Sequence, residues 1–552
     1  MRDRRFAAGR VAICITGLLV LTLGMYRLYE LPRVGERPAQ WALLAGLVIC
    51  SGLLMALISP IANRLLMILV EPVRRYGLWA VAACALVAFS GFGLVAQYVL
   101  QGFPNSGDEY AFVLQAETYA QGRLWADVPP VVDAFRQYRF FELGDKWVSQ
   151  YPPGWAAILA PAAALGLPLW VVTALLGAGT LFAFFRLACL EVSLQTAWAG
   201  VIILGTSAFF ILNSASFFSH SLTAFCGILF ALMGLRYLEK ADFRCAVAAG
   251  VCLGLMGLTR SYNAVIFVVP FAVTLAMISG RRAGLVWLGL GGLPFLLALL
   301  AYNHQITGDP LTGVASLNGG EPFGFPASES LRLTVKRLRE LIVWTSPILV
   351  FGYIVALWRV IAQRRANFTD WIMPLTLLCF LFYFGDGGNQ YGPRYYFEAW
   401  PFAILTLAKA ADPLLAGAHH SRLRWIPAAI VASLLLQLSV SPGRLGLEHR
   451  VVEERQAVYN EVERAGLKNA IVLISGKVGS IRPMPARDLL RNGLNVNDRD
   501  IVYAHDLGER NRELMALYPG RNIYIYSDIP QMNASSERQS SHSGSLRQSG
   551  IR

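Results

Sequence analysis

The chain has 552 residues, of which 55% are hydrophobic and only 15% are charged. Soluble domains carry about 25% charged residues, so this composition excludes a soluble enzyme and predicts a polytopic membrane protein. The net charge of +13 does not indicate nucleic-acid binding, because the Arg and Lys residues stand mostly in short loops between apolar runs rather than in basic stripes with interleaved aromatic residues.

Apolar runs that approach the length of a membrane-spanning helix, about 20 residues, recur along the chain. The first run, from Val11, follows a basic N-terminus but has no small-x-small cleavage site, so we expect an uncleaved membrane helix rather than a signal peptide. The sequence predicts about thirteen spanning helices, near 11–26, 41–60, 77–100, 168–188, 196–213, 220–238, 245–259, 262–280, 283–303, 341–361, 371–385, 396–411 and 425–441.

The basic residues between these runs predict the orientation. If every run crosses the membrane, one side receives the Arg and Lys clusters at 2–10, 64–75, 236–244, 281–282, 364–365 and 422–424. The positive-inside rule identifies that side as the cytoplasm. The polar loops 101–153, 304–340 and 386–395 and the tail after 442 then share the outer side.

The first long outer loop contains the motif Gly107-Asp108-Glu109-Tyr110. Two adjacent carboxylates at a bilayer surface are costly unless they are solvated or used. The apolar spacing over 108–122 predicts a helix lying in the interface plane. The loop ends at Tyr151-Pro152-Pro153-Gly154-Trp155, where consecutive prolines enforce a stiff, extended backbone. The stretch 154–166, interrupted by Pro161, predicts a short interfacial or partly inserted helix.

After Ser441 the pattern changes to alternating helices and strands. We expect helices over 445–465, 486–492 and 508–517, and strands over 470–475, 500–504 and 522–527. This alternation predicts a small α/β domain outside the membrane. The predicted domains are an N-terminal helix pair (1–76), a membrane domain (77–441) with the outer loop 101–153, an outer α/β domain (442–530) and a disordered tail (531–552) rich in Ser, Gln and Arg.

Several motifs follow one another with a common outer placement. They are Asp108-Glu109-Tyr110, Gly122-Arg123-Leu124-Trp125, Tyr151-Pro152-Pro153-Gly154-Trp155, Leu258-Thr259-Arg260 and Gly392-Pro393-Arg394-Tyr395-Tyr396. In this order they resemble the C superfamily of membrane glycosyltransferases, near the protein O-mannosyltransferases, the lipid A aminoarabinose transferases and the bacterial galacturonosyltransferases. The resemblance covers about residues 80–410 and leaves out the N-terminal helix pair and the tail domain. It implies a bacterial inner-membrane protein with its active site facing the periplasm.

The resemblance implies that a carboxylate of this loop deprotonates the acceptor hydroxyl, and that the donor is a sugar on polyprenyl phosphate. Asp108 is the candidate base, and Glu109 would orient the acceptor or tune Asp108. A carboxylate beside a second carboxylate near lipid should have a raised pKa and be a better base. The alternative role for Asp108, which follows Ser106-Gly107, is to cap the interfacial helix. The two roles can coexist.

The leaving phosphate needs positive charge, best supplied by Arg. The candidate phosphate-binding residues are Arg260, Arg394 and Lys146. Arg260 stands alone between two apolar runs, and its alternative role is an ordinary charge at the membrane interface. Glu398 follows Arg394 by four residues, so the two could pair on a helix. The candidate pocket residues are Tyr151, His220, Gln390 and Tyr391.

No metal or cofactor motif is evident, although a divalent metal stays open because some members of the superfamily use one. All eight cysteines stand in apolar runs, which argues against a disulfide framework or a zinc site. The sequence has no Walker A loop and no Rossmann fingerprint, so we expect no nucleotide-sugar or ATP. The predicted function is transfer of a hexosyl or pentosyl group from a polyprenyl-phosphate donor to a lipid, glycan or protein acceptor. The alternatives are a transporter or flippase of lipid-linked saccharide, which would usually show internal repeats, and a polysaccharide polymerase or ligase.

Overall fold

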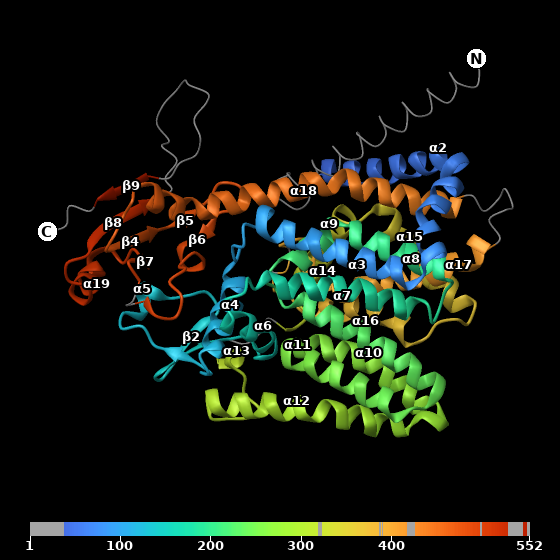
Figure 1. Cartoon of the computed structure of the whole chain (residues 1–552), viewed down its shortest axis with the longest axis horizontal. Helices are drawn as coiled ribbons and strands as arrows, with labels where there is room; N and C mark the ends of the chain where they lie inside the picture. Colours follow the sequence, from blue (N-terminus) through green and yellow to red (C-terminus); the bar gives the residue numbers. More distant parts are fainter. Residues whose placement is uncertain are drawn as a thin grey trace, which may run out of the picture.

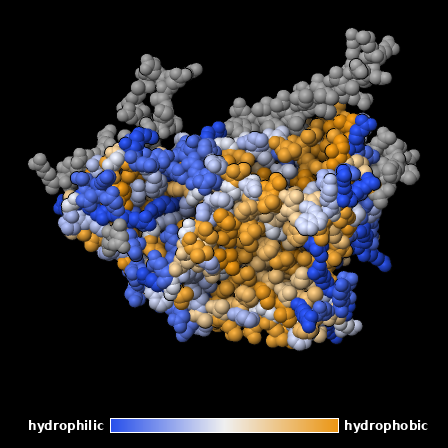
Figure 2. Space-filling model, viewed as in Figure 1, coloured by the Kyte–Doolittle hydropathy of each residue, from blue (hydrophilic) through white to orange (hydrophobic). Residues whose placement is uncertain are grey.

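The computed structural model describes residues 38–317, 323–385, 388, 390–416, 425–496, 499–527 and 545–548. The predicted first helix at 11–26 lies outside these residues. Long helices run side by side across the molecule, and the C-terminal strands gather at one end beside the outer loop (Figure 1). A broad apolar surface covers the helices, and hydrophilic residues cover the end with the strands and part of the opposite edge (Figure 2). This distribution is that of a multi-pass membrane protein with one enlarged polar end.

Within the described ranges, seven helices are long and apolar enough to cross a membrane, or up to nine if each of two bent pairs is one span. The seven belong to α2 (Pro38–Tyr76), α3 (Leu78–Leu94), α7 (Trp170–Ala188), α10 (His220–Lys240), α11 (Phe243–Met277), α12 (Ala283–Thr307) and α18 (Trp425–Arg464). The bent pairs are α8 (Leu194–Thr206) with α9 (Ala208–Ala215), at 65°, and α14 (Ala327–Trp344) with α15 (Pro347–Ala362), at 114°. The predicted count of about thirteen is not confirmed. The first run lies outside the described residues, α11 counts once although two runs were predicted there, and α16 (Ile372–Leu381) and α17 (Trp400–Ala416) are too short.

The helix α11 is interrupted at its centre. Arg260 leaves helical geometry there, with φ −144° and ψ 80°. A Cβ on Gly257 would lie 3.7 Å from the Cβ of Ala264, whereas seven residues of a straight helix rise about 10.5 Å. The chain therefore turns back sharply at Arg260. The two halves correspond to the runs predicted at 245–259 and 262–280, with Arg260 at the turn between them.

The helix α18 differs from the prediction, which separated a span at 425–441 from a second helix at 445–465. It is one continuous helix of 40 residues with Pro442 inside it. Its buried side continues through this region, with Ser441, Arg444, Glu448 and Val451 all buried. This spacing of three to four residues is that of one helix face, so packing keeps the helix continuous where proline would weaken it.

The outer loop begins with α4 (Gly107–Ala120), which confirms the helix predicted over 108–122. A small antiparallel sheet follows in the order β1 (Ala126–Asp127), β3 (Lys146–Ser149), β2 (Phe140–Leu143). The short helix α5 (Val132–Phe135) lies between β1 and β2 in the sequence. The loop returns to the bundle at α6 (Gly154–Ala164), which contains Pro161 as predicted and has only 11 residues, too few to span a bilayer.

The C-terminal unit contains the three predicted strands as a parallel sheet. The sheet order is β7-β4-β8-β9, formed by β7 (Ile501–His505), β4 (Ala470–Ser475), β8 (Asn522–Ser527) and β9 (Ser545–Gln548). β9 pairs antiparallel with the free edge of β8, so these four residues differ from the predicted disorder of 531–552. The predicted helix at 486–492 is only a 3₁₀ turn (Ala486–Asp488), and α19 (Asn511–Leu517) confirms most of the helix predicted at 508–517.

The outer loop and the C-terminal unit share a core. Ala134 and Phe135 of α5 are buried together with Ile471, Leu473 and Val502 of the C-terminal sheet. Apolar burial of this kind contributes about 25 cal/mol per Å². The sheet is therefore packed onto the loop that carries the acid pair.

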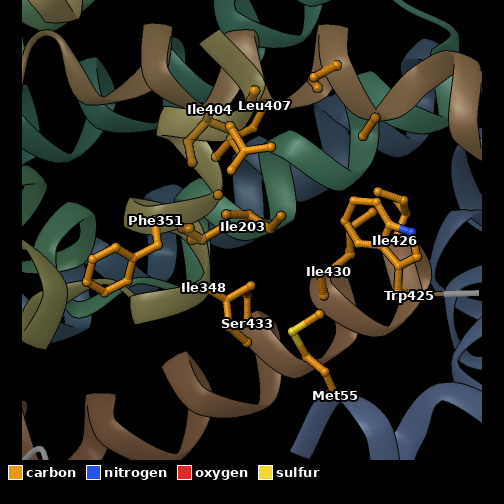
Figure 3. Close-up of a pocket in the computed structure, with 18 of the residues that line it drawn as sticks. Met55, Ile203, Ile348, Phe351, Ile404, Leu407, Trp425, Ile426, Ile430 and Ser433 are labelled. Carbon is orange, nitrogen blue, oxygen red and sulfur yellow. The ribbon is translucent and has the colours of Figure 1, made fainter. Parts of the chain in front are cut away.

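An apolar cavity of about 380 Å³ lies among α2, α8, α15, α17 and α18 (Figure 3). Its lining includes Met55, Ile203, Phe351 and Trp425. Among the described residues of its lining, Arg359 is the one charged side chain and none is acidic. Without a carboxylate to act as a base, this cavity is not a candidate for the chemistry of the acid pair.

Candidate active site

The helix α4 is capped by Ser106. The Ser106 Oγ accepts a hydrogen bond from the backbone N–H of Glu109 (3.1 Å) and lies 3.2 Å from Glu109 Oε2. Asp108 is consequently the second residue of the helix, and the alternative that Asp108 is its cap is wrong. The sequence holds a signal for this arrangement, because Ser-x-x-Glu before an apolar run is typical of a helix N-terminus.

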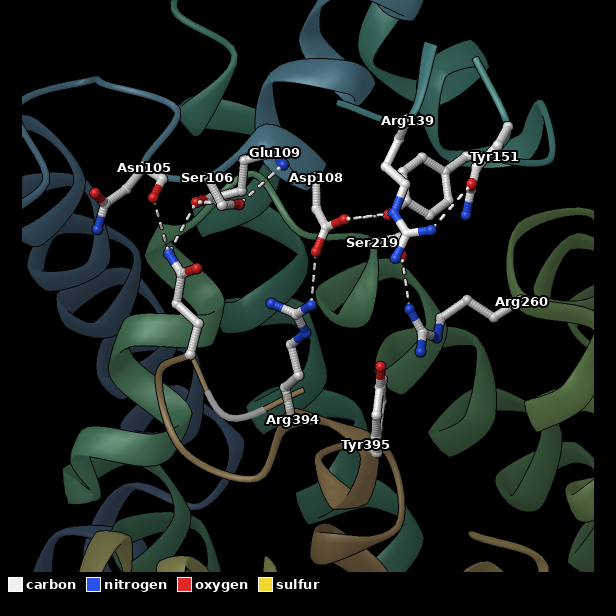
Figure 4. A network of polar contacts seen from close by, with 12 residues as sticks. Asn105, Ser106, Asp108, Glu109, Arg139, Tyr151, Ser219, Arg260, Arg394 and Tyr395 are labelled. Atoms are coloured by element: carbon white, nitrogen blue, oxygen red, sulfur yellow. Dashed lines mark hydrogen bonds and ion pairs between the residues drawn. The ribbon is translucent and has the colours of Figure 1, made fainter. Parts of the chain in front are cut away.

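The Asp108 carboxylate meets three side chains from separate parts of the chain (Figure 4). Its Oδ2 accepts a hydrogen bond from Arg394 Nη2 at 2.7 Å. Its Oδ1 accepts one from the Tyr151 hydroxyl and lies 3.6 Å from Arg139 Nε. The side chain is 15% exposed, so part of it is open to solvent.

These partners reverse the expected pKa shift of Asp108. Burial alone would raise the pKa, but the charge of Arg394, the hydrogen bond from Tyr151 and the charge of Arg139 outweigh it and hold the pKa below its ordinary value. The prediction of a raised pKa is wrong because cations, and not the neighbouring carboxylate, face Asp108. In this state Asp108 is ionised but fully engaged.

Glu109 points into the protein. Its residue is 0% exposed, and its carboxylate accepts hydrogen bonds from the backbone N–H of Phe217 (3.1 Å) and from Gln390 Nε2 (3.3 Å). Burial raises the pKa of Glu109 to about 7. Glu109 therefore joins α4 to two other segments and does not face the side of Asp108 that solvent reaches.

Arg394 and Arg260 contact two consecutive residues, Phe218 and Ser219. The Arg394 guanidinium lies over the ring of Phe218, 4.0 Å from its centroid. Arg260 Nη1 donates to Ser219 Oγ at 3.4 Å. The side chains of Arg394 and Arg260 are 10% and 20% exposed. One guanidinium group, that of Arg394, thus contacts Asp108, and the Arg260 group reaches the residue that follows Phe218. Such a pair of guanidinium groups suits an anionic ligand.

Glu398 pairs with Arg260 and His220 rather than with Arg394. Its Oε1 lies 3.4 Å from Arg260 Nε and 2.8 Å from His220 Nδ1. The expected pairing with Arg394 fails because Arg394 belongs to a separate 3₁₀ turn (η4, Arg394–Tyr396) and turns toward Asp108. His220 is fully buried behind Glu398, so the structure places it as support for Arg260.

The loop before Arg394 contains two consecutive residues with positive φ angles. Tyr391 and Gly392 have φ values of +58° and +92°. A Cβ on Gly392 would lie 2.7 Å from the ring of Phe209, so only glycine fits. Gln390 and the fully buried Tyr391 both contact Asn105, through the Asn105 carbonyl and Nδ2 respectively. These two predicted pocket residues support the loop and are placed behind the reacting side.

Lys146 lies apart from the cluster. Its Nζ donates to the carbonyl of Gln305 at 2.6 Å and lies 4.6 Å from the ring centroid of Trp125. The structure thus brings together Asp108, Tyr151, Arg260 and Arg394 but gives Lys146 different partners. Among the described residues, no three His, Cys, Asp or Glu side chains are grouped so that they could hold a metal ion.

Comparisons with known proteins give a fold. No protein-family model matches the chain, and no curated protein matches its sequence. ArnT from Cupriavidus metallidurans bound to undecaprenyl phosphate matches with a TM-score of 0.52 and 14% identity, over 80% of this chain and 93% of ArnT. Its apo state matches with a TM-score of 0.51 and 14% identity, over 81% and 93%. At 14% identity this likeness shows a shared fold, so the chain has the fold of ArnT.

Three side chains that complete the cluster have no evident sequence signal. Arg139 is one basic loop residue among many, and its φ of +67° is unusual for a residue other than glycine. Arg337 of α14 is 1% exposed and donates to the carbonyls of Phe380 (3.0 Å) and Gly385 (2.9 Å), just before the Arg394 loop. Asn105 joins α4 to that same loop. Each acts through contacts between distant segments, which periodicity does not encode.

Proposed function

We propose that the chain is a glycosyltransferase that moves a sugar from a polyprenyl-phosphate donor to an acceptor hydroxyl at the outer face of the bacterial inner membrane. The observation that carries the proposal is the contact of the carboxylate of Asp108 with Arg394. Arg394 lies over Phe218, and Arg260 reaches the next residue, Ser219. This cluster joins a base to phosphate-binding groups, on a fold shared with a protein that was solved with undecaprenyl phosphate.

The proposed reaction is a displacement at the anomeric carbon of the sugar. Asp108 accepts the proton of the acceptor hydroxyl as its oxygen forms the new bond to that carbon. The bond between the carbon and the phosphate oxygen breaks, and polyprenyl phosphate leaves with the electron pair. Arg394 and Arg260 stabilise the negative charge on the leaving phosphate, in the way that pre-placed cations lower barriers. The products are the glycosylated acceptor and polyprenyl phosphate.

Arg394 connects donor binding to activation of the base. Without donor, its guanidinium engages Asp108 at 2.7 Å, which makes Asp108 a weak base. A donor phosphate competes for the same guanidinium. When Arg394 turns toward the phosphate, Asp108 loses part of the positive charge that depresses its pKa and becomes the stronger base. The base is thereby fully active only when the donor is present.

A transporter or flippase of lipid-linked saccharide is the alternative, and a polysaccharide polymerase or ligase would share the donor. Transporters place their binding residues near the middle of the membrane, on repeated halves. Here the charged cluster is built from the outer loop, the turn of α11 and the start of η4, at one end of the helices. This placement favours chemistry at the membrane surface.

The test uses the purified protein in nanodiscs with polyprenyl-phosphate hexoses and pentoses and with candidate lipid, glycan and protein acceptors. The proposal expects release of polyprenyl phosphate in step with sugar transfer, for one donor above the others. If no donor is consumed, while a labelled donor changes leaflet in vesicles containing the protein, the chain is a flippase and the proposal is wrong. Chain-length analysis of the product separates single transfer from polymerisation.

A further inference from the structure

Asn105 is the point where the C-terminal helix meets the acid pair. It is 0% exposed and directly precedes Ser106, the cap of α4. Arg455 of α18 donates through Nη1 to the Asn105 side-chain oxygen at 2.7 Å and also to the Asn105 backbone carbonyl. Arg455 is itself only 6% exposed. A buried guanidinium that binds one residue through both its backbone and its side chain fixes that residue in position and orientation.

The other side of Asn105 faces the loop that leads to Arg394. Its Nδ2 donates to the Tyr391 hydroxyl at 3.1 Å. Gln390 Nε2 contacts both the Asn105 carbonyl and Glu109 Oε2, each at 3.3 Å. Arg455 therefore holds the residue that connects the start of the Asp108 helix to the loop before Arg394 (Figure 4 shows the Asn105 end).

The C-terminal segment that follows α18 fastens the same stretch. Arg491 Nη2 donates to the Pro104 carbonyl at 2.8 Å, and the backbone N–H of Gly493 donates to the Tyr110 hydroxyl at 2.9 Å. Contacts on both sides of Asn105 thus come from the part of the chain after the membrane helices. These bonds hold residues before and after Asp108 in the sequence, and they therefore act on its position.

We infer that Arg455 is a positioning residue that sets the distance between Asp108 and Arg394, so that the C-terminal unit belongs to the machinery of transfer. This inference rests on the proposed function. The Asp108–Arg394 contact joins α4 to η4, and Asn105 is a bonded link between the two segments. A variant without Arg455 keeps both Asp108 and Arg394, but Asn105, which links their two segments, is no longer held in position. A misplacement of about 1 Å can lower a rate about 100-fold.

The test compares Arg455→Met with Arg455→Lys, with Asn105→Ala and with the double variant. Arg450→Met is the matched control, since Arg450 is an exposed arginine of the same helix. For Arg455→Met we expect a fall in kcat of roughly 10- to 100-fold with donor affinity within about threefold of wild type, because the phosphate-binding residues are retained. Arg455→Lys should recover part of the rate. The double variant should be no slower than the slower single variant, because both changes remove the same link.

Hydrogen exchange gives a second readout that does not need turnover. Arg455→Met should speed exchange about tenfold or more in both 105–110 and 390–394, whereas Arg450→Met should not. Unchanged exchange in these segments overturns the inference, as does a wild-type kcat in Arg455→Met or a parallel loss of donor affinity and rate. If wild type transfers no sugar, the proposed function fails, and the exchange result still decides whether Arg455 orders the acid pair.

Discussion

Replacement of Arg394 by Gln tests the double role of this guanidinium. The change removes the charged partner of Asp108 at 2.7 Å and one of the two proposed phosphate ligands. A hydrogen bond to a charged group contributes about 1.5–3 kcal/mol. Each 1.4 kcal/mol corresponds to about a tenfold change in rate or affinity, so loss of the phosphate contact alone should lower kcat/KM by about 10- to 100-fold.

The same variant should also change the pH profile. Removing the positive charge raises the pKa of Asp108, which must be ionised to act as a base. Activity is lost on acidification as Asp108 takes up a proton, so the acidic limb of kcat/KM should move to higher pH in Arg394→Gln. Arg394→Lys keeps the charge without the forked geometry and should shift this limb less while still binding donor weakly.

The assay is the release of polyprenyl phosphate across a pH series, with folding checked by the melting temperature of each variant. A wild-type kcat/KM in folded Arg394→Gln, or an acidic limb that moves to lower pH, would show that Arg394 has neither role.

Three further predictions follow from the surroundings of the cluster. Glu109→Gln should flatten the pH dependence of stability. The pKa of Glu109 is about 7 in the fold against 4.5 for a free glutamate, so its stabilising contribution is full below pH 4.5 and is lost as pH rises through 7. Thermal unfolding at several pH values would show whether the variant has a higher melting temperature than wild type above pH 7. Glu398→Gln should raise the donor KM about tenfold, because it removes the charged partner that holds Arg260 in position. An unchanged KM in donor titrations would contradict a supporting role of Glu398. Lys146→Gln should keep the donor KM within about twofold of wild type, as is usual for surface substitutions. A tenfold rise would instead indicate that Lys146 binds the donor phosphate.

The features that the sequence predicts well depend on local patterns. The spacing of apolar residues identifies α4, and the strands after residue 470 are recognisable from short apolar runs between turns. Arg260 is noticeable because a charge between apolar runs is rare, and the structure places it at a turn beside Glu398. In each case the deciding information lies within one segment of the chain.

The features that the sequence does not predict depend on distant partners. Asp108 and Arg394 are 286 residues apart, and their contact reverses the direction of the Asp108 pKa shift. Glu109, next to Asp108 in the sequence, points to the opposite side because successive helix residues face different directions. The change of pattern after Ser441 predicted two helices, but buried packing on both sides of Pro442 keeps α18 continuous.

Transfer by Asp108→Asn, reconstituted with the donor that wild type consumes, decides whether Asp108 is the base. Asparagine keeps the size of the side chain and can still accept a hydrogen bond from Tyr151, but it cannot take up the proton of the acceptor. We expect a folded variant that binds the donor and transfers its sugar at least about 100-fold more slowly than wild type. Transfer by the folded variant at a rate near that of wild type would contradict the assignment of Asp108 as the base.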